Sequence, residues 1–262
     1  MFTPKDLQHF HQLGIRTQEV ESQIQNFVKG FPYMEIQAPA TVGNGVTRLS
    51  EEEINIAIKQ YEDALSGKDV VKFVPASGAA SRMFKHLFSF IESYDGSPEA
   101  YAKFTEDQDF NSTFNFFKQL DSFAFYPDLQ ATFTDDSLEE THLKKGYVQI
   151  LEHLLTEKGL DYGMLPKGLL KFHQYAEGNR TPLEEHLAEA ANYAKGKGGV
   201  AKLHFTVSPE HEQKFKNRLA EVKPQFEKKL DVVFDVSFSQ QKPSTDTIAV
   251  DMQNQPFRNE DG

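Results

Sequence analysis

Residues 72–85 read Lys72-Phe73-Val74-Pro75-Ala76-Ser77-Gly78-Ala79-Ala80-Ser81-Arg82-Met83-Phe84-Lys85, and this stretch decides the fold. The apolar run at residues 70–74 predicts a strand, and the five small residues at 76–80 predict a tight turn. A helical pattern begins at Ser81-Arg82, because Met83, Leu87, Phe90 and Ile91 fall on one face. We therefore expect a strand, a turn of small residues and a helix N-terminus.

Such a turn is suited to binding an anion. Small residues let backbone N–H groups approach a phosphate, and the helix end adds unpaired donors and partial positive charge. Arg82 at the helix start can add bidentate contacts to phosphate oxygens. The alternative is a tight connection whose small residues serve packing alone, and the turn by itself does not decide between the two.

The composition excludes several classes of function. The 262 residues suffice for one large α/β domain or two small ones. With 39 acidic and 28 basic residues the net charge is −11, which argues against non-specific nucleic-acid binding. The absence of cysteine excludes disulfides, thiolate metal sites and a cysteine nucleophile. No apolar run approaches the roughly 20 residues of a membrane span, and no signal-peptide pattern is visible, so we expect a cytoplasmic protein without membrane contact.

The remaining pattern alternates helices with strands. Residues 1–66 are expected to form a helical N-terminal extension, in which Ser50 and Glu53 form a capping box. Residues 95–163 are expected to form a helical insertion without strands. It opens at Ser97-Pro98, includes a helix over residues 138–157, and has a core stripe made of Phe104, Phe110, Phe114 and Phe117.

Later strands are expected at residues 201–207, 232–238 and 247–250, with His204 a core histidine of the first of them. Strands separated by helices predict an α/β fold with a mostly parallel, three-layer, Rossmann-like sheet. We place this domain at residues 67–262, with the helical insertion inside it.

Two further blocks follow the turn. They read Pro166-Lys167-Gly168-Leu169 and Pro182-Leu183-Glu184-Glu185-His186, the second behind the helix cap Thr181. With Ala76-Ser77-Gly78-Ala79-Ala80-Ser81-Arg82-Met83, they resemble in order the signature of sugar nucleotidyltransferases, Ala-x-Gly-x-Gly-Thr-Arg-Met, Pro-Lys-x-Leu and Pro-Leu-x-x-His. The chain looks most similar to the UDP-sugar pyrophosphorylase branch, and more closely to an uncharacterised bacterial family related to it. The resemblance covers about residues 70–95 and 164–262.

The chain departs from this signature at several points. Ala80 replaces the second loop glycine, Ser81 replaces the threonine, and 82 residues separate Met83 from Pro166 where the family has a short link. The helical insertion accounts for that gap. The later Gly-rich, His-containing loop and the strand ending in an Asn/Asp pair do not appear before Gly262. We therefore expect either the N-terminal part of a longer protein or a reduced homologue.

The resemblance implies a nucleotide-diphospho-sugar transferase fold and transfer of a nucleotidyl group from a nucleoside triphosphate to a sugar 1-phosphate. Arg82 would then clamp the β- and γ-phosphates, and Lys167 would neutralise charge at the α-phosphate or the sugar phosphate. The nucleotide would be bound by Ala76, Ser77, Gly78, Ala79, Ala80, Ser81 and, at the base, Gln241. Mg²⁺ is implied as cofactor, but no residue is assigned to it.

Other readings remain open. Arg82 also fits a surface ion pair, Lys167 an exposed lysine, Gln241 a polar turn, and His186 a packing or capping residue. The protein could bind a nucleotide or sugar phosphate without catalysis. It could also be a structural interaction protein that uses its Phe-rich insertion.

Overall fold

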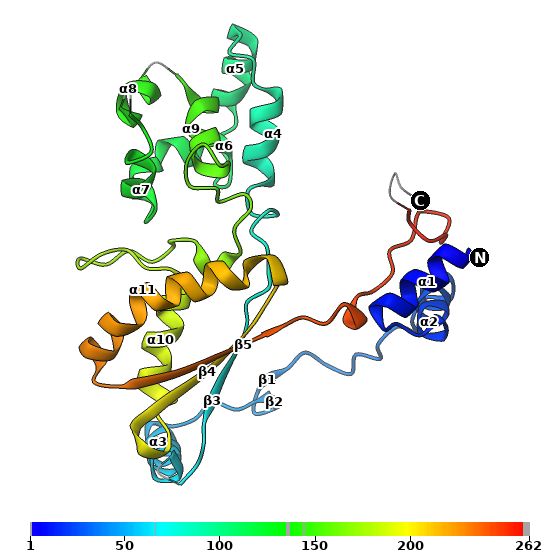
Figure 1. Ribbon diagram of the computed structural model, residues 1–262, viewed down its shortest axis with the longest axis vertical. Helices are drawn as coiled ribbons and strands as arrows, with labels where there is room; N and C mark the ends of the chain where they lie inside the picture. Colours follow the sequence, from blue (N-terminus) through cyan, green and yellow to red (C-terminus); the bar gives the residue numbers. More distant parts are fainter. Residues whose placement is uncertain (1, 66, 135–136, 144, 259–262) are drawn as a thin grey trace. The chain divides into compact units, whose positions relative to one another are not determined.

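The computed structural model describes residues 2–65, 67–134, 137–143 and 145–258, and Figure 1 shows the chain. Two compact units are formed, one by Met1–Tyr61 with Gln241–Gly262 and the other by Glu62–Gln240. In this division residues 241–262 group with the N-terminal helices, whereas the sequence placed them in the α/β domain at residues 67–262. None of the helices in the described ranges combines the length and apolar character needed to cross a bilayer.

The first unit contains α1 (Pro4–Leu13), α2 (Thr17–Lys29), the two-residue strands β1 (Thr41–Val42) and β2 (Gly45–Val46), and most of α3 (Glu51–Leu65). The capping box that opens α3 is confirmed, since the N–H of Ser50 donates to the Glu53 carboxylate at 2.7 Å. Two contacts attach the C-terminal segment. Arg258 pairs with Asp6 at 2.8 Å, and the N–H of Ile248 donates to Gln23 Oε1 at 2.8 Å.

These contacts explain why the expected strand at residues 247–250 does not form. The N–H of Ile248 is taken by a glutamine side chain of α2, and only Val250 makes an isolated bridge, to Pro256. The sheet of the second unit therefore has three described strands, β3 (Val71–Pro75), β4 (Val200–Val207) and β5 (Val233–Gln240). They are parallel and lie in the order β3-β4-β5.

Two helices cover one face of this sheet. Figure 1 shows α10 (Pro182–Tyr193) and α11 (Glu212–Leu230) beside the sheet. Their apolar side chains share one core with alternate residues of the strands. Burial alternates strictly along β4, with Ala201, Leu203, Phe205 and Val207 inward, as the period of two requires. The core of this α/β layer consists mainly of Val74, Leu183, Leu187, Ala190, Ala201, Leu203, Phe205, Val207, Phe215, Val222 and Phe234.

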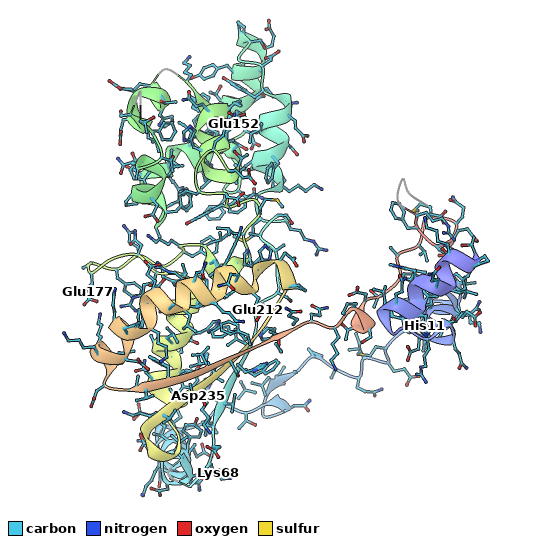
Figure 2. All side chains as sticks on the ribbon, viewed as in Figure 1. His11, Lys68, Glu152, Glu177, Glu212 and Asp235 are labelled. Atoms are coloured by element: carbon cyan, nitrogen blue, oxygen red, sulfur yellow. The ribbon has the colours of Figure 1, made fainter. Side chains whose placement is uncertain are left out.

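The opposite face carries exposed side chains, including Phe73, Val233 and Asp235, the last labelled in Figure 2. His204 lies on this face and not in the core, because it follows the outward half of the β4 alternation. Its ring nitrogens lie 2.8 Å from the hydroxyls of Ser237 and Ser239. The fold is thus mixed α/β with a short parallel sheet, and the expected three-layer arrangement is not confirmed.

A second core lies among the helices of residues 85–155, called here the helical lobe. It contains α4 (Lys85–Ser93), α5 (Pro98–Glu106), α6 (Thr113–Lys118), the 3-10 turn η1 (Leu120–Ser122), α7 (Tyr126–Gln130), α8 (Leu138–Leu143) and α9 (Tyr147–Leu155). The expected Phe stripe supplies this core through Phe104 and Phe117, which lie 4.8 Å from the Tyr147 ring. Phe110 is 92% exposed, so it is not part of the core.

Two helix boundaries differ from expectation. α4 begins at Lys85, whereas a start at Ser81 was expected; residues 81–84 form turns, with the N–H of Met83 donating to the carbonyl of Ala80 at 2.8 Å. The helix expected over 138–157 is divided, because Gly146 separates α8 from α9 and a Cβ there would lie 2.6 Å from the Thr141 side chain. The cap of α5 is as expected, with Ser97 accepting from the N–H of Ala100 at 3.1 Å.

Candidate functional site

The first two sequence blocks are paired segments that join the α/β layer to the helical lobe. Ala79 and Pro166 form an antiparallel bridge. The N–H of Lys167 donates to the carbonyl of Gly78 at 3.0 Å, and the N–H of Ala80 donates to the carbonyl of Leu165 at 3.3 Å. The chain thus brings together two blocks that are 82 residues apart in sequence.

The three blocks surround one cavity of about 180 Å³. The turn contributes Ala76 and Gly78, the second block Lys167 and Gly168, and the N-terminal turns of α10 contribute Pro182, Leu183 and His186. The remaining walls are Val74 and Pro75 of β3, Phe205 of β4 and Phe215 of α11. Most of the lining residues are apolar, and Lys167 and His186 are the two with ionisable side chains.

The other expected site residues lie at different places. Ala80 is fully buried in the core of the helical lobe, and its N–H is already bonded to Leu165, so it does not offer a donor to a ligand. Ser81 and Arg82 are exposed on the turn before α4 and are not among the residues that line the cavity. Ser77 is half-buried. Gln241 belongs to the other compact unit, where its side-chain amide donates to Thr245 Oγ1 at 3.3 Å.

Two backbone N–H groups of the turn remain available. The N–H of Ala76 donates to the carbonyl of Thr206 at 2.7 Å, which fixes the turn to the end of β4. Within the described part of the chain, the N–H groups of Gly78 and Ala79 donate to no backbone or side-chain acceptor. Of these two residues, Gly78 is among those that line the cavity.

The position of Gly168 leaves no room for a side chain. A Cβ at this position would lie 2.8 Å from Cζ and 2.9 Å from Cε1 of the Phe215 ring. The missing side chain lets the second block approach α11 closely, and this contact forms one wall of the cavity. Neither Phe215 nor Phe205 was expected at the site, because only tertiary contact brings these core rings to the motifs.

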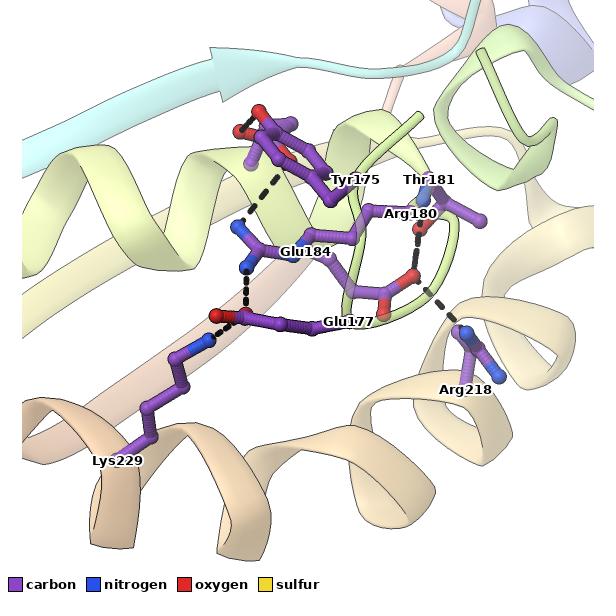
Figure 3. Close-up of polar contacts among 8 residues, drawn as sticks. Tyr175, Glu177, Arg180, Thr181, Glu184, Arg218 and Lys229 are labelled. Carbon is purple, nitrogen blue, oxygen red and sulfur yellow. Dashed lines mark hydrogen bonds and ion pairs between the residues drawn. The ribbon is translucent and has the colours of Figure 1, made fainter. Parts of the chain in front are cut away.

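The N-terminus of α10 is held by a buried carboxylate, as Figure 3 shows. Glu184, which is 5% exposed, accepts from the N–H of Thr181 at 2.9 Å and from its hydroxyl at 2.8 Å. Arg218 of α11 donates to the same carboxylate at 2.9 Å. This is the expected capping box extended by a cation, and it fixes the turn that carries Pro182 and Leu183.

A second group of polar contacts lies beside it in Figure 3. The Arg180 guanidinium lies 4.2 Å from the Tyr175 ring centroid and within 3.6 Å of the Glu177 and Glu185 carboxylates. Glu177 also pairs with Lys229, near the end of α11. The ion pair between Glu177 and Lys229 thereby attaches the segment that precedes α10 to α11.

His186 belongs to a polar row along α10. Its Nδ1 lies 3.3 Å from Glu189 Oε2, and Glu189 in turn pairs with Lys72 of β3, which also bonds the Tyr193 hydroxyl. The hydrogen bond from Lys72 holds the pKa of Glu189 below its usual value, so this carboxylate is ionised near neutral pH. The signal for His186 was present in the third block, but a role in the cavity was not assigned to it.

The described residues do not include a group of three or more His, Cys, Asp or Glu placed to hold a metal ion. The residues around the cavity also lack a carboxylate. They therefore do not fit a resident Mg²⁺, which prefers oxygen ligands, and we assign no residue to this ion.

Comparison with known families gave one match. The family described as "Domain of unknown function (DUF4301)" matches residues 3–262. Searches of curated proteins and of solved structures gave no significant match. The match covers nearly the whole chain, including both compact units and all three sequence blocks, so the protein belongs to the DUF4301 family, a domain of unknown function.

Proposed function

We propose that the cavity binds the phosphate group of a nucleotide or sugar phosphate. We further propose that the protein transfers a nucleotidyl group from a nucleoside triphosphate to a sugar 1-phosphate with release of pyrophosphate. The observation that supports this proposal is the convergence of the three blocks on one cavity. A chance match of short motifs gives no reason for residues so far apart in sequence to share a site.

The size of the cavity limits what enters it. Its volume of about 180 Å³ is below the roughly 300–1,000 Å³ of sites that enclose a drug-sized ligand. A phosphoryl group fits this space, and the nucleoside and sugar would lie outside it. The N–H of Gly78 and the ammonium of Lys167 would contact the phosphoryl oxygens, because both belong to residues that line the cavity.

Arg82 would act from outside the cavity. Its side chain is exposed on the turn that follows Ala80, and it forms no ion pair with the described residues. A triphosphate anchored at Lys167 extends beyond the cavity, so an exposed guanidinium on the adjoining turn is suited to the outer phosphates. Mg²⁺ would arrive as part of the metal–triphosphate substrate, and no step is derived through it.

Binding without transfer is the second candidate. The lining favours it in one respect, because it offers an amine, an imidazole and backbone donors but no carboxylate. Such a set can hold a phosphate ester, whereas a metal-assisted transfer normally uses carboxylates that orient the ion.

Isothermal titration with UTP, ATP, CTP and GTP, each with Mg²⁺, tests the binding. We expect one or more to bind, and Lys167→Ala to weaken that binding about tenfold, as expected for a lost charge-assisted hydrogen bond. Lys228→Ala is the control, because this exposed lysine lies on α11 away from the cavity lining. Failure of all four to bind, or equal losses in both variants, would refute the proposed site.

Pyrophosphate release separates the two candidates. The wild-type protein is incubated with a triphosphate that binds and a panel of sugar 1-phosphates, and pyrophosphate is measured. Release that depends on the sugar phosphate supports transfer. Binding without release under any of these conditions supports the second candidate.

A further inference from the structure

His186 is the one titratable side chain besides Lys167 among the residues that line the cavity. The ring lies on the second turn of α10, and its centroid is 6.1 Å from that of Phe205, which is fully buried on β4. The side chain is 31% exposed, so solvent reaches it and it is not sealed in the core. Its position differs from that of a packing histidine.

Charged side chains of α10 and β3 lie beside Nδ1 of the His186 ring. Glu189 Oε2 lies 3.3 Å from Nδ1, and the same oxygen pairs with the Lys72 ammonium. Lys72 is only 11% exposed at its side chain, and its bonds to Glu189 and to the Tyr193 hydroxyl hold the ammonium beside the carboxylate. An ionised carboxylate beside Nδ1 favours the tautomer with a proton on Nδ1, which leaves Nε2 as the nitrogen that can accept one.

We propose that His186 takes up a proton when a phosphate ester enters the cavity. The imidazolium then donates Nδ1–H to Glu189 and Nε2–H to a phosphoryl oxygen, and the proton comes from the bulk solvent. This inference rests on the proposed function, and it assigns to His186 the second cation of the site. Glu189 and Lys72 are positioning residues that hold the ring through Nδ1.

The charged groups around the ring and the cavity belong to three elements. Glu189 lies on α10 itself, Lys72 on β3, and Lys167 on the 3-10 turn η2 (Lys167–Leu169). The walls from β4 and α11, Phe205 and Phe215, are uncharged. The anion of the ligand and the Glu189 carboxylate both favour the imidazolium, and the two ammonium groups oppose it. The empty cavity lacks the anion, so proton uptake should accompany ligand entry.

An ordinary i,i+3 contact on a helix surface would give the same distance between His186 and Glu189. That reading predicts no change in ring protonation when a ligand binds. The two readings therefore differ in a quantity that can be measured, namely the number of protons bound per ligand.

The test is titration calorimetry of the whole protein at pH 6.5 in buffers of different ionisation enthalpy. Each of UTP, ATP, CTP and GTP is used with Mg²⁺. The dependence of the observed heat on the buffer gives the protons taken up. We expect His186→Gln to take up fewer protons per ligand than wild type and to bind about tenfold more weakly. His86→Gln, an exposed histidine on α4, is the control and should match wild type.

A second measurement concerns the ring itself. Long-range ¹H–¹⁵N correlation spectra of the protein without ligand should show His186 with its proton on Nδ1, assigned by its loss in His186→Gln. Glu189→Ala should shift this ring toward the Nε2–H form. Conversion toward imidazolium on adding the ligand completes the expected result.

The outcomes are separable. If none of the triphosphates binds wild type, the proposed function and this inference both fail. If one binds but His186→Gln leaves both affinity and proton uptake unchanged, only the role of His186 fails. An Nε2–H tautomer in the free protein would also overturn it, whatever the ligand does.

Discussion

Replacing Glu184 by alanine should destabilise the protein by about 3 kcal/mol, because three hydrogen bonds end on this buried carboxylate. Glu184 is 5% exposed, and the variant loses its hydrogen bonds to Thr181 and Arg218, which are 2.8 to 2.9 Å long. A lost N-terminal cap costs about 1 kcal/mol. Loss of a partner from a buried ion pair costs about 3–5 kcal/mol. We take the lower part of that range, because the Arg218 side chain is 23% exposed and keeps a second partner.

That second partner supplies the matched control. Glu221 pairs with the same arginine at 2.8 Å, but its side chain is 65% exposed, so Glu221→Ala should cost under about 1 kcal/mol. Urea unfolding followed by circular dichroism at 222 nm measures both, since the chain has no tryptophan. Restored stability in Glu184→Ala/Arg218→Met would confirm that the unpaired guanidinium causes the loss. Equal costs for the two single variants would refute the reasoning.

Two other perturbations follow from the site and the helical lobe. Gly168→Ala places a Cβ about 2.8 Å from the Phe215 ring. This variant should lower the free energy of unfolding in urea by about 1–3 kcal/mol and weaken triphosphate binding. Gly78→Ala, where a Cβ meets open space, should lower the free energy of unfolding less. Burial raises the pKa of Tyr162 to about 12. The stability gained from keeping this phenol neutral in the folded protein is present below pH 10 and is lost as the pH rises toward 12. Absorbance at 295 nm should therefore show Tyr162 ionising together with alkaline unfolding. Tyr162→Phe should remove this part of the absorbance change.

The sequence predicts best those features that local chemistry decides. The capping boxes at Ser50 and Thr181 and the cap at Ser97 form as expected, because each depends on residues within one turn. The strands at 200–207 and 233–240 also lie within two residues of their expected places. Their alternation of apolar residues is enforced by burial against α10 and α11.

Tertiary contact decides what the sequence does not show. Ala80 was expected to contact a nucleotide, but it is buried in the core of the helical lobe and its N–H bonds to the carbonyl of Leu165. The helix expected from Ser81 begins at Lys85. The apolar residues at 247–250 have strand character, yet contact with α2 leaves them without a neighbouring strand. Of the expected site residues, Ala76, Gly78 and Lys167 line the cavity, whereas the walls formed by Phe205 and Phe215 required the packed structure.

The most direct test of the account is a map of where a nucleotide binds. Amide chemical shifts of the whole protein are followed by NMR as UTP with Mg²⁺ is added. We predict that the largest changes lie at Gly78, Lys167, Gly168 and His186, which come from all three blocks. Changes centred on the pocket of the helical lobe around Phe90, Lys103 and Phe114, with the three blocks unaffected, would contradict it.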